Sequence, residues 1–253
     1  MSDKKLATAF ISLIFHLIIF AFVLPFTRAS DLLFITSYSL IYLLPIVFVY
    51  LISGKEFNPI KFKKLEFTDL YRISLFFLFF IVLSIILGFL FPDEIPEYEF
   101  SLRTLITAGI LGPVLEELLW RGVVFASLSR YSAVFASIYS SLLFAMLHTG
   151  SSGLIYAFIG GMIFSFLYLK SGSLLPGIVL HLVNNLVSTL SPIFPLALRI
   201  ALTLTLTVIL LAKTKFKIYL KPSSPIKLEF DRRIFASPFI YITFIIVAIL
   251  RYI

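Results

Sequence analysis

The feature that most limits the fold of this chain is a succession of apolar runs long enough to cross a lipid bilayer. A spanning helix needs about 17–25 mostly apolar residues, and backbone inside the hydrocarbon must satisfy its own hydrogen bonds, which favours helices. Runs of this length occur at residues 6–26, 32–52, 73–91, 104–128, 131–148, 153–169, 174–190, 193–212 and 234–250. Only residues 191–195 separate the seventh run from the eighth. The sequence therefore predicts an all-α, polytopic membrane bundle of eight or nine transmembrane helices.

The composition agrees with this prediction. Of the 253 residues, 60% are hydrophobic and 13% are charged, whereas soluble domains carry about 25% charged residues. The chain has no cysteine, which excludes disulfides and cysteine-ligated metal sites. No repeat or soluble region interrupts the series of runs, so we expect residues 1–253 to form a single membrane domain.

The basic residues predict how the chain lies in the membrane. With a cytoplasmic N-terminus and nine helices, the outer side would hold only Arg28, Arg103, Arg199 and Arg251, and Arg121 would lie within the membrane. The cytoplasmic side would hold Lys4, Lys5, Lys55, Lys61, Lys63, Lys64, Arg72, Arg130, Lys170, Lys213, Lys215, Lys217, Lys221, Lys227, Arg232 and Arg233. This imbalance follows the positive-inside rule. It assigns the net charge of +8 to the topology of the chain in the membrane, so we expect no nucleic-acid partner. The basic loop of residues 213–233 would also contact the anionic headgroups of the lipid bilayer.

Three ionisable residues interrupt the fourth apolar run. Glu116, Glu117 and Arg121 lie within residues 104–128, where each charge costs about 2.5–3.5 kcal/mol at the bilayer centre. Glu117 and Arg121 are four residues apart with the acid first, which favours a helical ion pair. Glu116 points about 100° away from that pair and has no local partner. The spacing therefore predicts a structural Glu117 and a Glu116 that acts as a general base.

Two of the three histidines lie in the apolar runs that follow. His148 comes four residues after Phe144, and His181 comes four residues before Asn185, so each pair shares a helix face. The third, His16, has no polar companion in its run, and we expect it to pack. Any one of these residues is explained by helix packing alone. Together, a glutamate, two histidines and an asparagine on nearby helices suit water activation and oxyanion stabilisation.

These residues resemble the signature of the CPBP (Abi) intramembrane proteases, a family that includes the type II CAAX prenyl endoproteases. The resemblance covers residues 104–190 as a catalytic core, with residues 1–103 and 191–253 as flanking transmembrane helices. A ninth helix departs from the eight that are usual in the CAAX enzymes. The resemblance rests on three motifs in order, Glu116-Glu117-x-x-x-Arg121, Phe144-x-x-x-His148 and His181-x-x-x-Asn185.

The resemblance implies a role for each residue. Glu116 and His148 would activate a water, and His181 and Asn185 would stabilise the oxyanion of the intermediate. Glu117, Arg121 and Phe144 would support them. The substrate would be a membrane-associated protein or a lipidated peptide, for which a cavity must open within the membrane, and Gly112 and Pro113 are the expected place for irregular backbone.

Two questions stay open at the level of sequence. Glu116, His148 and His181 would make a His₂Glu zinc set with an open position, but the chain has no HExxH motif, and we favour a glutamate-activated water without zinc. A catalytically silent scaffold or bacteriocin-immunity protein would carry the same apolar helices, and a transporter would also place Glu and His in the membrane. The intact set of polar residues argues against the scaffold, and the lack of paired repeats argues against the transporter.

Overall fold

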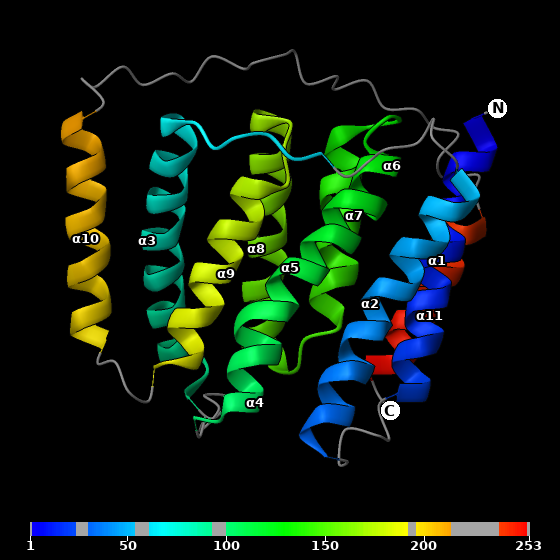
Figure 1. Cartoon of the computed structure of the whole chain (residues 1–253), viewed down its shortest axis with the longest axis horizontal. Coiled ribbons are helices and arrows are strands. Elements are labelled where there is room, and N and C mark those ends of the chain that lie inside the picture. Colours follow the sequence, from blue (N-terminus) through cyan, green and yellow to red (C-terminus); the bar gives the residue numbers. More distant parts are fainter. Residues whose placement is uncertain are drawn as a thin grey trace.

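The computed structural model describes residues 2–23, 30–53, 61–92, 100–191, 196–213 and 238–251. The regular elements in these ranges are helices, and the longer ones run side by side to form a bundle (Figure 1). They are α1 (Ser2–Val23), α2 (Asp31–Ser53), α3 (Phe67–Leu90), α4 (Leu102–Thr104), η3 (Leu105–Leu111), α5 (Gly112–Glu117), η4 (Leu118–Phe125), α6 (Ala126–Leu128), α7 (Ala133–Met146), α8 (Gly150–Ser171), α9 (Leu175–Thr189), α10 (Leu196–Lys213) and α11 (Pro238–Arg251).

Each of the nine apolar runs corresponds to one helix in the described ranges, if α4 to α6 are counted as one continuous helix. The all-α prediction is therefore confirmed. Three helices of the described chain are long and apolar enough by themselves to cross a membrane, namely α2, α3 and α8. The chain is thus a multi-pass helical membrane protein, and the total of eight or nine spans stays a prediction.

The continuous helix from Leu102 to Leu128 is irregular on both sides of α5. The π-helical segments η3 and η4 flank the α-helical Gly112–Glu117, and the Gly112 N–H bonds the Thr107 carbonyl five residues back. Pro113 has no N–H to donate, so one backbone hydrogen bond is absent inside this continuous helix, at the point where η3 passes into α5. The irregular backbone expected at Gly112 and Pro113 thus lies on either side of α5, in η3 and η4, and not at these two residues themselves. Such π segments occur often at functional sites.

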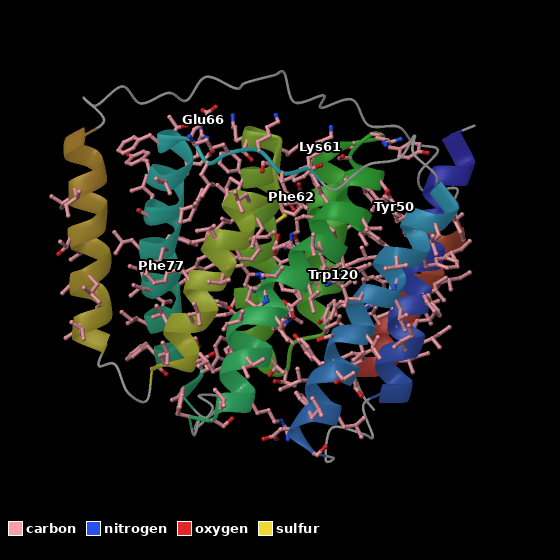
Figure 2. All side chains as sticks on the ribbon, in the orientation of Figure 1. Tyr50, Lys61, Phe62, Glu66, Phe77 and Trp120 are labelled. Atoms are coloured by element: carbon pink, nitrogen blue, oxygen red, sulfur yellow. The ribbon has the colours of Figure 1, made fainter. Side chains whose placement is uncertain are left out.

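Packing in the bundle places apolar side chains on both its inside and its outside. Trp120 is fully buried near the middle of the bundle (Figure 2), whereas Leu32, Leu51 and Phe89 are 76%, 73% and 85% exposed. Large apolar side chains exposed to this degree suit a lipid surface. His16 is buried, its Nδ1 lies 2.9 Å from the Ile41 carbonyl oxygen, and it packs as expected.

Candidate active site

The end of α5 directs its two glutamates to different surroundings. Glu117 accepts a hydrogen bond of 3.0 Å from Nη1 of Arg121, and the two side chains are 1% and 0% exposed. The ion pair expected from their spacing is therefore present and fully buried. Glu116, one residue earlier, is 14% exposed and lines a cavity.

Aromatic rings enclose the Arg121 guanidinium. Its central carbon lies 4.8 Å from the ring centre of Phe144 and 5.1 Å from that of Phe164. Its Nε and Nη2 have no hydrogen-bond partner among the described residues, so the faces of these rings supply part of its stabilisation. Helix α8 can approach this closely because residue 161 is glycine. A Cβ atom there would lie 2.7 Å from Ser141 and 2.9 Å from Nη2 of Arg121.

Two tyrosines of α2 hold the Glu116 carboxylate. The hydroxyl groups of Tyr38 and Tyr42 both donate to Oε1 of Glu116, each at 3.2 Å. Gly112 makes room for this contact, because a Cβ atom at that position would lie 2.7 Å from the Tyr38 hydroxyl. The sequence argument missed both tyrosines. Their only signal was a spacing of four residues, which places them on one helix face.

We expect the double substitution Tyr38→Phe with Tyr42→Phe to lower proteolytic activity through Glu116. Each hydrogen bond to a charged group contributes about 1.5–3 kcal/mol, and without them the carboxylate loses its fixed position. The rate of peptide cleavage should fall while the protein still folds, because phenylalanine fills nearly the same space. Tyr50→Phe is the matched control, since Tyr50 lies on the same helix, is 65% exposed and does not line the cavity. Equal activity of the double variant and the wild type would show that the tyrosines do not position Glu116.

His181 connects the two glutamates. Its Nδ1 donates to Oε1 of Glu117 at 3.1 Å, and its Nε2 lies 3.7 Å from Oε2 of Glu116. The imidazole stacks on Phe164, with ring centres 4.6 Å apart and planes 19° apart. Glu117 therefore has a second role that its spacing to Arg121 did not reveal, because it also fixes the orientation of His181.

His148 lies just outside its predicted helix. Helix α7 ends at Met146, so His148 belongs to the short connection before α8 and not to the end of a helix over residues 131–148. Its Nδ1 donates to the Phe144 carbonyl oxygen at 3.0 Å, which leaves the lone pair of a neutral ring on Nε2. The Phe144 ring contacts the rings of both His148 and His181, at 4.7 and 6.1 Å, and so spaces the two imidazoles.

Asn185 stands at the end of a chain of hydrogen bonds. Its Nδ2 donates to the Ala108 carbonyl oxygen at 3.0 Å, and its Oδ1 accepts from Asn184 at 3.2 Å. Asn184 in turn accepts from the Tyr156 hydroxyl at 2.7 Å. The sequence argument did not include Asn184 or Tyr156. Since an amide nitrogen carries two hydrogens, Asn185 keeps a second donor besides the one bonded to Ala108.

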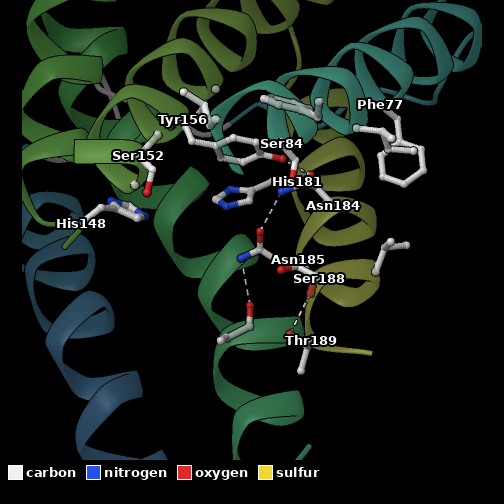
Figure 3. A pocket seen from close by; sticks show the side chains of 18 of the residues that line it. Phe77, Ser84, His148, Ser152, Tyr156, His181, Asn184, Asn185, Ser188 and Thr189 are labelled. Carbon is white, nitrogen blue, oxygen red and sulfur yellow. Dashed lines mark hydrogen bonds between the residues drawn. The ribbon is translucent and has the colours of Figure 1, made fainter. Parts of the chain in front are cut away.

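One cavity of about 860 Å³ brings the four proposed catalytic side chains together. Glu116, His148, His181 and Asn185 all line it, although they come from three separate parts of the chain, namely α5, the connection between α7 and α8, and α9. In Figure 3, His148 and His181 lie on opposite sides of the cavity with their rings directed toward one another.

The structure does not arrange these residues as a metal site. Among the described residues, no group of three or more His, Asp or Glu side chains is placed to hold a metal ion. Glu116 Oε1 and His181 Nδ1 are bonded to protein groups, as the remote atoms of metal ligands commonly are, so these bonds do not decide between a His₂Glu zinc set and a glutamate-activated water. We therefore assign no step to a metal.

Comparisons with known proteins match the segment that carries this site. Residues 98–187 match the family described as type II CAAX prenyl endopeptidase Rce1-like. A protein of Bacillus subtilis (strain 168) named "Putative membrane peptidase YdiL" is 32% identical over 82 residues, which cover 32% of this chain and 34% of that protein. The chain thus matches about a third of the length of this curated relative. No solved structure matches the chain. Residues 98–187, which include the seven site residues predicted from the sequence, are therefore the part of the chain that is similar to the Rce1-like type II CAAX prenyl endopeptidases.

Proposed function

We propose that the chain is an intramembrane endopeptidase in which Glu116 activates a water molecule that attacks a peptide carbonyl. The proposal rests on the contacts of the Glu116 carboxylate and on its position in the cavity wall. This carboxylate is held by two tyrosine hydroxyls, with two histidines lining the same space. A general base needs this combination of fixed position and access to a substrate.

The cavity residues suit the steps of hydrolysis. Glu116 takes a proton from the water as its oxygen bonds the carbonyl carbon, and His148 assists through its Nε2. The carbonyl oxygen gains negative charge, which His181 and Asn185 stabilise by hydrogen bonds. The proton held by Glu116 then passes to the leaving amine as the C–N bond breaks, which restores the carboxylate.

The second glutamate, Glu117, neutralises a buried charge and orients His181. Glu117 and Arg121 neutralise one another in a buried pair, so the negative charge that faces the cavity belongs to Glu116. Glu117 also receives the Nδ1 proton of His181, which leaves Nε2 of that ring directed to the side of Glu116. The two glutamates thus divide into a base and an orienting group.

The position of the site indicates a substrate that is itself in the membrane. Its cavity is lined by α3, α8 and α9, and the apolar outer faces of this bundle suit lipid. A scissile bond reaches such a cavity most readily from a membrane-associated protein or a lipidated peptide, including prenylated CAAX-type proteins.

We expect a membrane-tethered peptide to be cut much faster than the same peptide without its anchor. Anchoring raises the local concentration of the substrate near the cavity. The test uses purified protein in vesicles, with one candidate sequence offered as a lipidated and as a free peptide, and Glu116→Gln as the inactive control. Cleavage that depends on Glu116 but is equal for both peptides would contradict this account of specificity. Cleavage that persists in Glu116→Gln would contradict the assignment of the base.

A further inference from the structure

The backbone carbonyl of Ala108 lies inside the π-helical segment η3, yet it accepts a hydrogen bond from another helix. In the π register, an N–H bonds the carbonyl five residues back, as the Gly112 N–H bonds Thr107. The donor for Ala108 in this register would be residue 113, which is a proline and has no N–H. The Asn185 side chain of α9 supplies a donor instead, with its Nδ2 3.0 Å from the Ala108 oxygen. Pro113 therefore leaves a carbonyl to which α9 can bond.

A second proline of the chain has the same effect in α2. Pro45 lies inside that helix, so the carbonyl four residues earlier, that of Ile41, has no donor in the α-helical register. His16 of α1 contacts this oxygen through its Nδ1 at 2.9 Å. In both helices, a proline frees a carbonyl and a polar side chain of another helix bonds to it. Of the two carbonyls, that of Ala108 belongs to a residue of the cavity wall.

The Ala108 carbonyl sets the direction of every hydrogen bond in the chain that starts from it. A carbonyl can only accept, so the Asn185 amide must turn its nitrogen toward Ala108 and its oxygen the other way. That oxygen accepts from Nδ2 of Asn184 at 3.2 Å, and the Asn184 oxygen accepts from the Tyr156 hydroxyl at 2.7 Å. A rotated Asn185 amide would place two oxygens against each other at Ala108. Tyr156, Asn184 and Asn185 all line the cavity, as Figure 3 shows.

Packing holds Tyr156, which is the first donor of this chain. Its ring contacts that of Phe80 in α3, with ring centres 5.3 Å apart, and the residue is half-buried. Tyr156 belongs to α8, Asn184 and Asn185 belong to α9, and Ala108 belongs to η3. The hydrogen bonds therefore join three helices around the Asn185 amide, and its position does not depend on α9 alone.

From these contacts we propose that Pro113, Asn184 and Tyr156 are positioning residues that hold the Asn185 amide in one orientation. This inference rests on the proposed function and adds three residues to it. Pro113 acts through the Ala108 carbonyl that it frees, and Tyr156 acts through Asn184. With one N–H and the oxygen of Asn185 bonded in this way, the second N–H is kept for the oxyanion of a substrate in the cavity. A donor that is fixed before the reaction stabilises developing charge without reorganisation.

The first arm of the test measures the cleavage of a lipidated peptide in vesicles by the purified protein. We expect Tyr156→Phe, Asn184→Leu and Pro113→Ala to lower kcat with little change in KM, because the oxyanion forms only in the transition state. Loss of one oxyanion donor costs about 10²–10³-fold in kcat, and loss of its orientation should cost about 10-fold or more. Tyr139→Phe is the matched control and should keep the wild-type kcat. Tyr139 is buried, donates to the Ile240 carbonyl oxygen at 3.0 Å and does not line the cavity.

Pro113→Ala separates positioning from stability. A proline inside a helix removes a backbone hydrogen bond and destabilises the helix, so alanine should not lower the unfolding temperature. The restored N–H can bond the Ala108 carbonyl and compete with Asn185, so kcat should fall all the same. A fall in the unfolding temperature together with kcat would make the role of Pro113 structural and would overturn its assignment as a positioning residue.

The second arm observes the asparagine side chains directly and does not depend on activity. The chain has three asparagines, Asn58, Asn184 and Asn185, so protein labelled with ¹⁵N-asparagine gives few side-chain amide signals in an NMR spectrum. The variants Asn184→Leu and Asn185→Ala identify the two signals that belong to the cavity. The chemical shift of each signal then reports whether its hydrogen bonds are present.

We expect Tyr156→Phe to move the Asn184 signal and Pro113→Ala to move the Asn185 signal. Pro45→Ala makes the same change in α2, away from the cavity wall, and should leave both signals in place. Unmoved signals in Tyr156→Phe and Pro113→Ala would overturn the inference, and so would moved signals with the kcat of the wild type.

The two arms also separate this inference from the proposed function. If the wild type cut no peptide while the asparagine signals moved as expected, the result would count against the proposed protease and leave the hydrogen-bond chain supported. If the wild type cut the peptide through Glu116 and Tyr156→Phe matched Tyr139→Phe in kcat, the protease would stand and the positioning role would be overturned.

Discussion

Glu116→Gln is expected to abolish proteolysis while leaving the fold almost unchanged. A positioned general base contributes about 10²–10⁴-fold to the rate, and a glutamine amide cannot take the proton of the attacking water. The amide oxygen can still accept the hydrogen bonds of Tyr38 and Tyr42. The buried ion pair on this helix joins Glu117 to Arg121 and does not involve Glu116. The measurement compares cleavage of a tethered substrate in membranes with the yield and thermal unfolding of the purified variant.

Glu117→Gln is the matched control for this prediction. It makes the same chemical change one residue away but removes the charge that faces Arg121 and the acceptor that faces His181. We expect it to lower the unfolding temperature, whereas Glu116→Gln should not. An equal loss of folded protein in the two variants would mean that both glutamates are structural, and it would remove the main support for an enzyme.

The helices could be predicted from the sequence because their cause is local. Apolar runs of sufficient length leave the backbone few alternatives in lipid, and each run became a helix. The ends were less accurate, as for the run at 131–148, which became Ala133–Met146 with His148 beyond it. The two π segments around α5 could not be predicted either, because no residue pattern distinguishes them from ordinary helix.

The site was predictable where its geometry follows from one helix and not where it depends on two. The ion pair of Glu117 and Arg121 follows from a spacing of four residues. The contacts of Tyr38 with Glu116 and of His181 with Glu117 join different helices. Such contacts depend on how the helices rotate and cross, which a single sequence does not specify. The three motifs therefore identified residues that the structure brings together, but not the contacts between helices that orient Glu116 and His181.

Arg121→Ala is expected to destabilise the protein strongly. Removal of one partner from a fully buried ion pair costs about 3–5 kcal/mol, because the other charge is left without compensation. Here Glu117 would be that charge, at 1% exposure, and the space between Phe144 and Phe164 would lose the guanidinium that fills it. The free energy of unfolding of the purified protein in detergent, measured by thermal or denaturant unfolding, should fall by this amount.

Arg103→Ala provides the comparison on the same continuous helix. Its ion pair with Asp31 is exposed, because the side chains of Arg103 and Asp31 are 34% and 72% exposed. Exposed pairs contribute about 0–1 kcal/mol to stability. The contact of Arg103 with the Phe34 ring adds about 0.5–1 kcal/mol. A double variant, Glu117→Gln with Arg121→Gln, should be more stable than Arg121→Ala, because no lone charge stays buried. If Arg121→Ala cost no more than Arg103→Ala, burial would not be what makes the pair important, and Glu117 would then act mainly through His181. In that case, the loss in Glu117→Gln should appear in activity and not in stability.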